Sequence, residues 1–255
     1  MDRIVKGLLA ASLVCLAAAG VAGASDPATP IATDRNAVTA SSIVVPRGSL
    51  QAENGFAETT SQGLRTYDGP ETLLRFGVAS KTELRLVAPN YFGQVGGASG
   101  FGDVTIGMKQ QLGPVHGFDV SLILSLSMPS GADAFSSHGF DPSVQLPWSR
   151  SLPRNWTAAG MLSVYFPTTG DRRNVTGETT FLVDRQLTKT WDAYVEYAGS
   201  LPQQGGPRHL LHFGTAYKPA PQHQLDFHVG VGLSRSAVDH FVGVGYSFRL
   251  QVFGR

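Results

Sequence analysis

The chain has 255 residues, with 20 Lys and Arg against 19 Asp and Glu, and 42% of its residues are hydrophobic. This near balance of charge leaves no basic stripe and no acidic tail, so we expect no nucleic-acid partner. Thirty glycines, with polar residues at the connections between apolar segments, favour an all-β chain with many turns.

Residues 1–24 have the pattern of a secretory signal peptide. Arg3 and Lys6 precede an apolar run at 8–19, and small residues follow it to form a cleavage site. The run is short for a spanning helix. The only cysteine, Cys15, lies in this run without the pattern of a lipoprotein signal, so we expect neither a lipid anchor nor a disulfide in the exported chain. Because two bases and one acid are removed with the segment, the exported chain is formally neutral.

Residues 25–48 form a leader rich in Pro, Ala, Ser and Thr without periodicity, which is typical of a flexible periplasmic segment. Residues 49–255 form one domain, in which apolar and polar residues alternate along about twelve strands. The predicted strands are 49–58, 70–79, 82–90, 102–112, 116–128, 141–149, 155–166, 175–187, 190–199, 208–218, 222–234 and 240–251.

Connector length alternates along these strands. Tight turns are predicted after the even-numbered strands, for example at 80–81 and 188–189, and longer polar loops after most odd-numbered ones, including 59–69, 91–101 and 129–140. Short turns at one end and long loops at the other are the pattern of outer-membrane barrels. A soluble sandwich offers no reason for such an alternation.

The faces of the strands support the same fold class. One face of the strand at 116–128 carries Val120, Leu122 and Leu124, whereas Ser121 and Ser125 lie on the other. Several polar faces carry charges at mid-strand, which the core of a sandwich would leave without solvent. Aromatic residues near the strand ends predict two interfacial girdles, unless they only pack at the sheet margins: Trp148, Trp156, Trp191 and Tyr217 at one end, Phe56, Tyr91, Phe92 and Phe166 at the other. We therefore predict a single transmembrane antiparallel β-barrel.

Several segments resemble a known family. They are Thr33-Asp34-Arg35, the stretches 45–56 and 73–77, Gly100 to Lys109, and Met128-Pro129-Ser130-Gly131. Together they resemble the bacterial outer-membrane family named for the meta-pathway of phenol degradation. The resemblance implies a barrel in the outer membrane and uptake of small, often hydrophobic or aromatic compounds. It brings no catalytic residues, and it alone suggests that the leader motif Thr33, Asp34 and Arg35 folds into the lumen as a plug.

The inward faces of the predicted strands supply candidate lumen residues. Opposite charges on neighbouring strands, such as Glu83 and Arg85 beside Asp103 and Lys109, can pair across the wall. Such a cluster either fills and stiffens the lumen or forms a polar constriction, and the narrow interior of a barrel of this size favours the first. The candidates for the solute path are Glu83, Arg85, Asp103, Lys109, Asp119, Glu178, Asp192, Glu196, His212, His228 and Arg249.

Catalytic and metal chemistry have weaker support. His212 and His228 face inward on consecutive strands with Asp226 nearby, but two imidazoles without a placed carboxylate make a weak zinc site, and a polar lumen patch is the better interpretation. Strand serines such as Ser125 stand in no nucleophile motif. We expect no cofactor, no metal and no enzymatic activity.

The favoured function is a passive outer-membrane channel for small molecules, with lipid, a solute and the barrel assembly machinery as partners. A barrel packed shut, acting structurally or through its loops, is the first alternative. A membrane-embedded hydrolase is the second.

Overall fold

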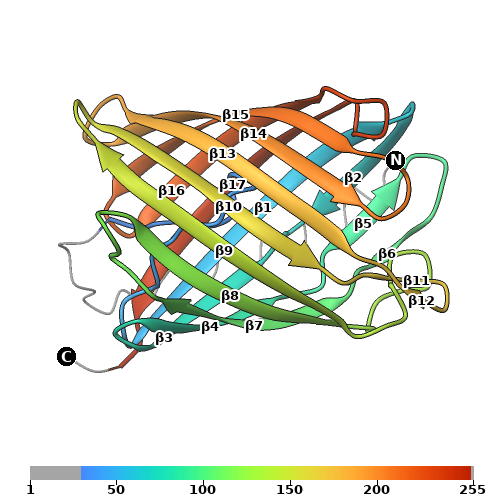
Figure 1. Ribbon diagram of the computed structural model, residues 1–255, viewed down its shortest axis with the longest axis horizontal. Helices are drawn as coiled ribbons and strands as arrows, with labels where there is room; N and C mark the ends of the chain where they lie inside the picture. Colours follow the sequence, from blue (N-terminus) through green and yellow to red (C-terminus); the bar gives the residue numbers. More distant parts are fainter. Residues whose placement is uncertain (1–29, 254–255) are drawn as a thin grey trace.

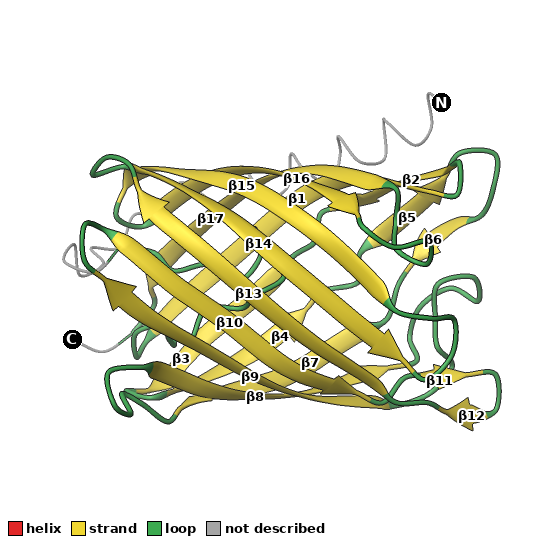
Figure 2. Cartoon of the chain, turned by 45° about the horizontal axis from the view of Figure 1, so that its top comes forward, coloured by secondary structure: helices red, strands yellow, loops and turns green. Residues whose placement is uncertain are grey.

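The computed structural model describes residues 30–253, and these form a closed antiparallel β-barrel (Figures 1 and 2). The predicted signal peptide, the start of the leader and the last two residues lie outside the described range. β1 pairs with β17 from Ser49 opposite Gln251 to Thr60 opposite His240, and this pairing closes the sheet into a ring. Among the described residues, no helix is long and apolar enough to cross a membrane.

The strands follow the sequence order around the ring. They are β1 (Ser49–Ser61), β2 (Leu64–Gly69), β3 (Leu73–Ala79), β4 (Thr82–Val87), β5 (Tyr91–Gln94), β6 (Ser99–Phe101), β7 (Val104–Gln111), β8 (Asp119–Met128), β9 (Asp141–Leu152), β10 (Trp156–Tyr165), β13 (Thr176–Gln186), β14 (Trp191–Pro202), β15 (Arg208–Ala220), β16 (His223–Gly232) and β17 (His240–Gln251). A loop carries the small hairpin of β11 (Thr168–Thr169) and β12 (Arg172–Arg173).

Three adjacent strands of the wall are interrupted at the same height. β2 continues β3, β5 continues β4 and β6 continues β7, with breaks at 70–72, 88–90 and 102–103. Counting each continuation once gives the twelve-stranded ring that the alternation predicts. At the breaks single backbone bonds cross between neighbours, such as that from the Gly102 amide to the Asn90 carbonyl at 2.8 Å.

The prediction of long loops at 59–69 and 91–101 is wrong. The first is a hairpin of β1 and β2 with a tip at Gln62 and Gly63, and the second is a hairpin of β5 and β6. Both extend the wall beyond the breaks. The first has polar residues on both faces, so no alternation marks it, although its Thr and Tyr residues favour strands.

The two ends of the barrel differ in their connections. Short turns such as 80–81 and 221–222 gather at the left in Figure 1, and longer loops such as 129–140 and 166–175 gather at the right. In outer-membrane barrels the short turns face the periplasm and the long loops face outside. We therefore name the two ends the periplasmic and the external end.

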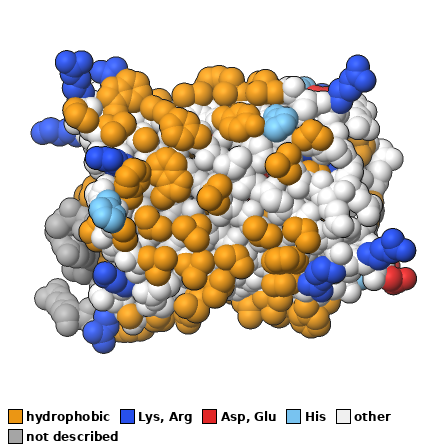
Figure 3. All heavy atoms as spheres, in the orientation of Figure 1, with side chains coloured by type: hydrophobic (Ala, Val, Ile, Leu, Met, Phe, Trp, Pro, Cys, Tyr) orange, Lys and Arg blue, Asp and Glu red, His pale blue; other side chains and the backbone are white. Residues whose placement is uncertain are grey.

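The outer surface of the barrel is apolar. Large hydrophobic side chains such as Leu84, Leu162 and Phe181 are exposed on successive strands, and Figure 3 shows them covering the middle of the barrel while Lys and Arg lie near the ends. This band matches the hydrocarbon region of a bilayer. The structure therefore presents its apolar strand faces to lipid rather than to a protein core.

The aromatic residues pair across neighbouring strands. Trp191 packs on Tyr217 near the periplasmic end with ring centroids 5.0 Å apart, and Phe56 stacks on Tyr67 at the other end. The girdle prediction is wrong for Phe92, because its ring stacks on Phe135 of the 129–140 loop beside a cavity. Phe92 is on β5 and its ring turns to the loop rather than to lipid.

Candidate functional site

Residues 31–45 of the leader lie against the inner wall of the barrel. The Ile31 amide donates to the Pro221 carbonyl at 2.7 Å, and Ile31, Val44 and Val45 are buried. Hydrogen bonds then lead around the wall from β16 past β14, β13, β9 and β8 to β4, where the Val45 amide donates to Glu83 at 2.7 Å. The segment thus occupies the middle of the lumen.

Arg75 of β3 gathers the ends of this segment. Its guanidinium is fully buried and donates to Glu83 at 2.8 Å and to Glu53 at 2.9 Å. The same side chain donates to the carbonyls of Ala32 and Ile43, each at 2.8 Å. Residues 32 and 43 therefore meet at one guanidinium, and we name the segment between them, 32–43, the leader loop. Closed loops of this size are a common surface motif, but here the loop lies inside a barrel.

Asp34 of the leader loop forms ion pairs with three cations of the wall. Arg85 lies 2.5 Å from its carboxylate, Lys109 lies 2.8 Å away, and Arg75 lies 3.1 Å away. Burial alone raises the pKa of Asp34, but these three cations outweigh it and hold the pKa well below its ordinary value. Asp34 also accepts from the Ser41 amide at 3.0 Å, so it joins both limbs of the loop.

The charges of this cluster balance. Its three acids are Asp34, Glu53 and Glu83, and its three bases are Arg75, Arg85 and Lys109. Apart from Arg85 at 10%, none of these side chains is more than 3% exposed. Taking a charge out of water costs several kcal/mol unless partners replace the water, so the cluster is stable only as a complete set.

A second set of bonds holds the loop on the opposite side. Glu196 of β14 accepts from the Thr39 amide at 2.6 Å and from the Val38 amide at 2.9 Å. Its carboxylate also lies 2.8 Å from Nδ1 of His212, which it orients. Tyr194 donates its hydroxyl proton to the Asn36 carbonyl. These bonds satisfy backbone groups of the loop that would otherwise be buried without partners.

Arg35 makes a third attachment. Its guanidinium donates to Asp226 of β16 at 2.6 Å and to Glu71 in the break between β2 and β3. The wall thus holds two consecutive residues of the leader motif, Asp34 through its carboxylate and Arg35 through its guanidinium.

An apolar contact also lies between the leader loop and the inner wall of the barrel. Ala40 of the loop forms a buried cluster with Ile123 of β8 and Met161 of β10, the latter two being 0% and 1% exposed. Ile123 lies between Ser121 and Ser125 on the inward face of its strand. Ala40 also lines a cavity beside the loop.

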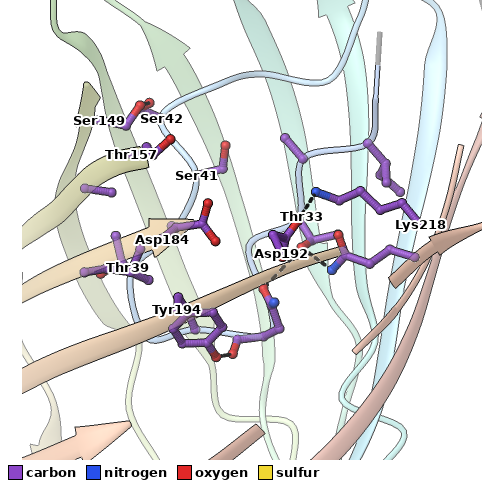
Figure 4. Close-up of a pocket in the computed structure, with 18 residues that line it drawn as sticks. Thr33, Thr39, Ser41, Ser42, Ser149, Thr157, Asp184, Asp192, Tyr194 and Lys218 are labelled. Atoms are coloured by element: carbon purple, nitrogen blue, oxygen red, sulfur yellow. Dashed lines mark hydrogen bonds and ion pairs between the residues drawn. The ribbon is translucent and has the colours of Figure 1, made fainter. Parts of the chain in front are cut away.

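The periplasmic cavity lies between the leader loop and β9 to β16, with a volume of about 250 Å³. Figure 4 shows Ser149, Thr157 and Asp184 on its wall, with Asp192 and Lys218 paired at 2.7 Å. The lining combines these polar and charged residues with apolar ones such as Ile31 and Leu182.

The external cavity has a volume of about 270 Å³ and is lined by β4 and β7 to β10. Its wall carries Ser125, Gln145 and Tyr165, and Gln145 donates to the Tyr165 hydroxyl at 2.9 Å. Arg85 lines the same cavity, so the charged cluster around Asp34 touches this space at one guanidinium.

The structure brings together some of the predicted lumen residues. Glu83, Arg85 and Lys109 meet at Asp34, as pairing across the wall predicts. Glu196 and His212 are in contact, and Nε2 of His212 lies 3.1 Å from Nδ1 of His228. Whether these residues line a solute path stays a prediction.

Other predicted residues lie apart from this group. Asp192 is in the periplasmic cavity, Glu178 accepts from the Tyr165 hydroxyl at 3.3 Å, and Asp119 begins β8 near the periplasmic end. Arg249 is buried on β17, where it is opposite Gln51 of β1. Thr33 of the leader motif accepts from Gln224 at 2.8 Å.

The expectation that Asp103 pairs on a strand beside Lys109 is wrong. Asp103 lies in the break before β7 and accepts from the amides of Ser130, Gly131 and Ser137, each at 2.9–3.0 Å. Burial raises the pKa of Asp103, but the hydrogen bonds from these amides lower it by a larger amount. The pKa of Asp103 is therefore below its ordinary value. Its role is to fix the 129–140 loop, because a break in the strand leaves these amides without strand partners.

Sequence reasoning missed Arg75 and Glu53, which are as central as Asp34. Both stand at mid-strand on inward faces, Arg75 between Leu73 and Gly77, and Glu53 two residues after Gln51. The same alternation that identified Glu83 would have found them. The acceptor carbonyls of the leader loop carry no such signal.

The candidate metal residues remain a polar patch. Within the described range, no group of three or more His, Cys, Asp or Glu side chains is arranged to hold a metal ion. His212 and His228 contact each other, and Asp226 accepts from Arg35 instead of turning to them as a third ligand.

The closed twelve-stranded ring with an apolar outer band is the fold of outer-membrane β-barrels. A family model described as "Putative MetA-pathway of phenol degradation" matches residues 33–250, and the chain belongs to this family. The matched range begins at Thr33, so it includes the leader motif. None of the curated protein sequences matches the chain.

Solved structures share the fold at low sequence identity. The COG4313 outer membrane channel from Pseudomonas putida F1 is 12% identical with a TM-score of 0.64, covering 81% of this chain and 97% of its own. The NanC porin is 9% identical with a TM-score of 0.57, covering 78% and 98%. The KdgM porin is 13% identical with a TM-score of 0.53, again covering 78% and 98%. These similarities show the barrel fold.

Proposed function

We propose that the protein is a passive outer-membrane channel for small molecules. The observation that carries the proposal is the pair of cavities inside the barrel, one beside the leader loop toward the periplasmic end and one toward the external loops. Serine, glutamine, tyrosine and charged side chains line them, and such linings select solutes by hydrogen bonding and charge. The channel and porin structures that share this fold support the same function.

The direct test is current across a planar bilayer. The purified, folded protein is expected to conduct, and Ile123→Ala to conduct more, because the substitution widens the lumen beside Ala40. Leu124→Ala is the matched control, since Leu124 is on the same strand but 41% exposed on the lipid face. No current from folded protein, or equal currents from both variants, would contradict the channel.

A sealed barrel with a structural or surface-binding role is the second candidate. The fully buried ion pairs of Arg75 with Glu53 and Glu83 favour it, because they fix the leader loop inside the lumen. This candidate predicts no current from the protein, even after Ile123→Ala. Neither candidate assigns the protein a catalytic step.

Lipid around the apolar band and a small-molecule solute in the cavities are the partners that this function requires. Insertion by the barrel assembly machinery is part of the proposal. The uptake of hydrophobic or aromatic compounds is suggested by the family's description alone, so the solute is best sought by comparing permeation of neutral and charged compounds through the same protein.

A further inference from the structure

The three cations around Asp34 form a built carboxylate site, and the chain fills it with its own side chain. Lys109 and Arg85 donate to the Asp34 carboxylate at 2.8 and 2.5 Å, and both are charged groups held within the wall. The neighbouring acids Glu53 and Glu83 belong to the wall, where both pair with Arg75 and Glu83 also pairs with Arg85 at 2.8 Å. Only the Asp34 carboxylate arrives on a segment that is not part of the barrel ring.

This site has access from outside the loop. Arg85 lines the external cavity, and its side chain is 10% exposed whereas those of Arg75 and Lys109 are 0% exposed. The cavity beside it has small or polar walls at Thr105, Gly107 and Ser125. A small carboxylate in this cavity therefore meets a guanidinium first, and guanidinium groups bind carboxylates strongly.

Displacement of Asp34 would act on the whole leader loop. Asp34 accepts from the Ser41 amide, and Lys109 donates to the Ser41 carbonyl at 2.8 Å, so the cluster holds the residue next to Ala40. Ala40 is the loop's contribution to the apolar contact with Ile123 and Met161. Loss of the Asp34 bonds would thus weaken the attachment beside Ala40 at Ser41, and the bonds of Thr39 to Glu196 and of Ser42 to β8 and β9 would remain.

We infer that small carboxylate solutes entering the external cavity compete with Asp34 for Arg85 and Lys109, and that this exchange releases the leader loop and joins the cavities. The inference rests on the proposed channel and adds to it a solute class and a ligand-opened gate. Asp34 and a solute carboxylate exclude each other at this site. The solute therefore shifts the equilibrium between the held and the released leader loop only by binding better to the protein in which the loop is released.

The test combines two readings on full-length protein in lipid. In a Cys15→Ser background, Ala40→Cys reports release of the loop through its rate of modification by a small maleimide. Bilayer current reports opening. Sodium butyrate is the probe and butyramide, its neutral counterpart of similar size, is the control. Butyrate is expected to raise both the labelling rate and the current by about fivefold or more, within the usual range of coupling between two ligands, whereas butyramide leaves them unchanged.

Variants locate the effect. Asp34→Asn is expected to raise basal labelling and current and to abolish the butyrate response, because the competing carboxylate is gone. Asp171→Asn makes the same change of charge at an exposed position between β11 and β12 and is expected to respond like the unaltered protein. Arg85→Gln is expected to weaken the butyrate response.

Equal responses to butyrate and butyramide, or an unchanged butyrate response in Asp34→Asn, would overturn the inference. Labelling needs no current, so the two proposals fail separately. If no variant conducts, the channel is wrong, and butyrate-dependent labelling still decides the carboxylate site.

Discussion

The two halves of the lumen wall differ in chemistry. On β1, β3, β4 and β7 the inward side chains are an ion-paired set around Asp34, with Arg75 at its centre. On β8, β9 and β10 they are mostly uncharged, such as Ser125, Gln145 and Met161. The charged strands fix the leader loop by many short ion pairs and hydrogen bonds, whereas β8, β9 and β10 hold it by two serine hydrogen bonds at Ser42 and by the apolar contact of Ala40. The leader loop is therefore held most firmly by the charged strands, whereas β8, β9 and β10 supply most of the lining of the external cavity.

Deleting residues 31–45 tests this division most severely. The barrel is expected to stay folded, because the pairing of β1 with β17 closes the ring without the leader. Conductance is expected to rise more than in any point variant, since both cavities then share one lumen. Single-channel recording measures this, and the gel mobility of unheated protein reports the folded barrel. Loss of the folded form would show that the leader is part of the core.

Arg75→Met is expected to be the most destabilising point substitution. It leaves Glu53, Glu83 and Asp34 buried without their common partner, which typically costs about 3–5 kcal/mol of unfolding free energy. Arg150→Met is the matched control, because Arg150 is exposed and lies over the Phe118 ring. Unfolding in urea measures the difference. Similar stabilities of the two variants would contradict the central role of Arg75.

Glu196→Gln tests the opposite attachment. A glutamine keeps one acceptor for the leader amides but presents an NH₂ group to the other, so the loop is expected to lose about 1–3 kcal/mol of attachment free energy. Faster modification of Ala40→Cys in this variant would show it. Glu178→Gln is the control, since its partner is the Tyr165 hydroxyl. Equal labelling rates would place the attachment on the Arg75 side alone.

The smallest effect is expected in acid. The pKa of Asp103 is depressed by amide donors, so its contribution to the fixed 129–140 loop is present above the ordinary aspartate pKa of about 3.9 and is lost as pH falls through its lower folded value. Proteolysis of this loop by an acid-active protease is expected to accelerate only below about pH 3.9. Asp103→Asn is expected to be cut faster at neutral pH as well.

The barrel could be predicted from the sequence because lipid on one side and polar groups on the other impose a period of two. The number of strands is confirmed, and the strand limits agree best where a face such as Leu122 and Leu124 meets lipid. The prediction failed at 59–69, where the hairpin carries polar residues on both faces and no alternation marks its strands.

The site was less predictable, for a different physical reason. Charges of the wall such as Glu83 and Lys109 follow the strand period, so their inward position could be inferred. The leader has no period, and its attachment depends on backbone groups such as the Val38 and Thr39 amides, which every sequence carries. Only the folded structure of the lumen determines which backbone amides donate to Glu196.

The path of the leader loop has a consequence for the order of assembly. Residues 32–43 bond both to the early strands β3 and β4 and to the late strands β14 and β16, yet the ring closes only when β17 reaches β1. The bonds to β14 and β16 can form only once these strands have joined the sheet. The leader loop therefore takes its final position late in assembly, when most of the wall is already present.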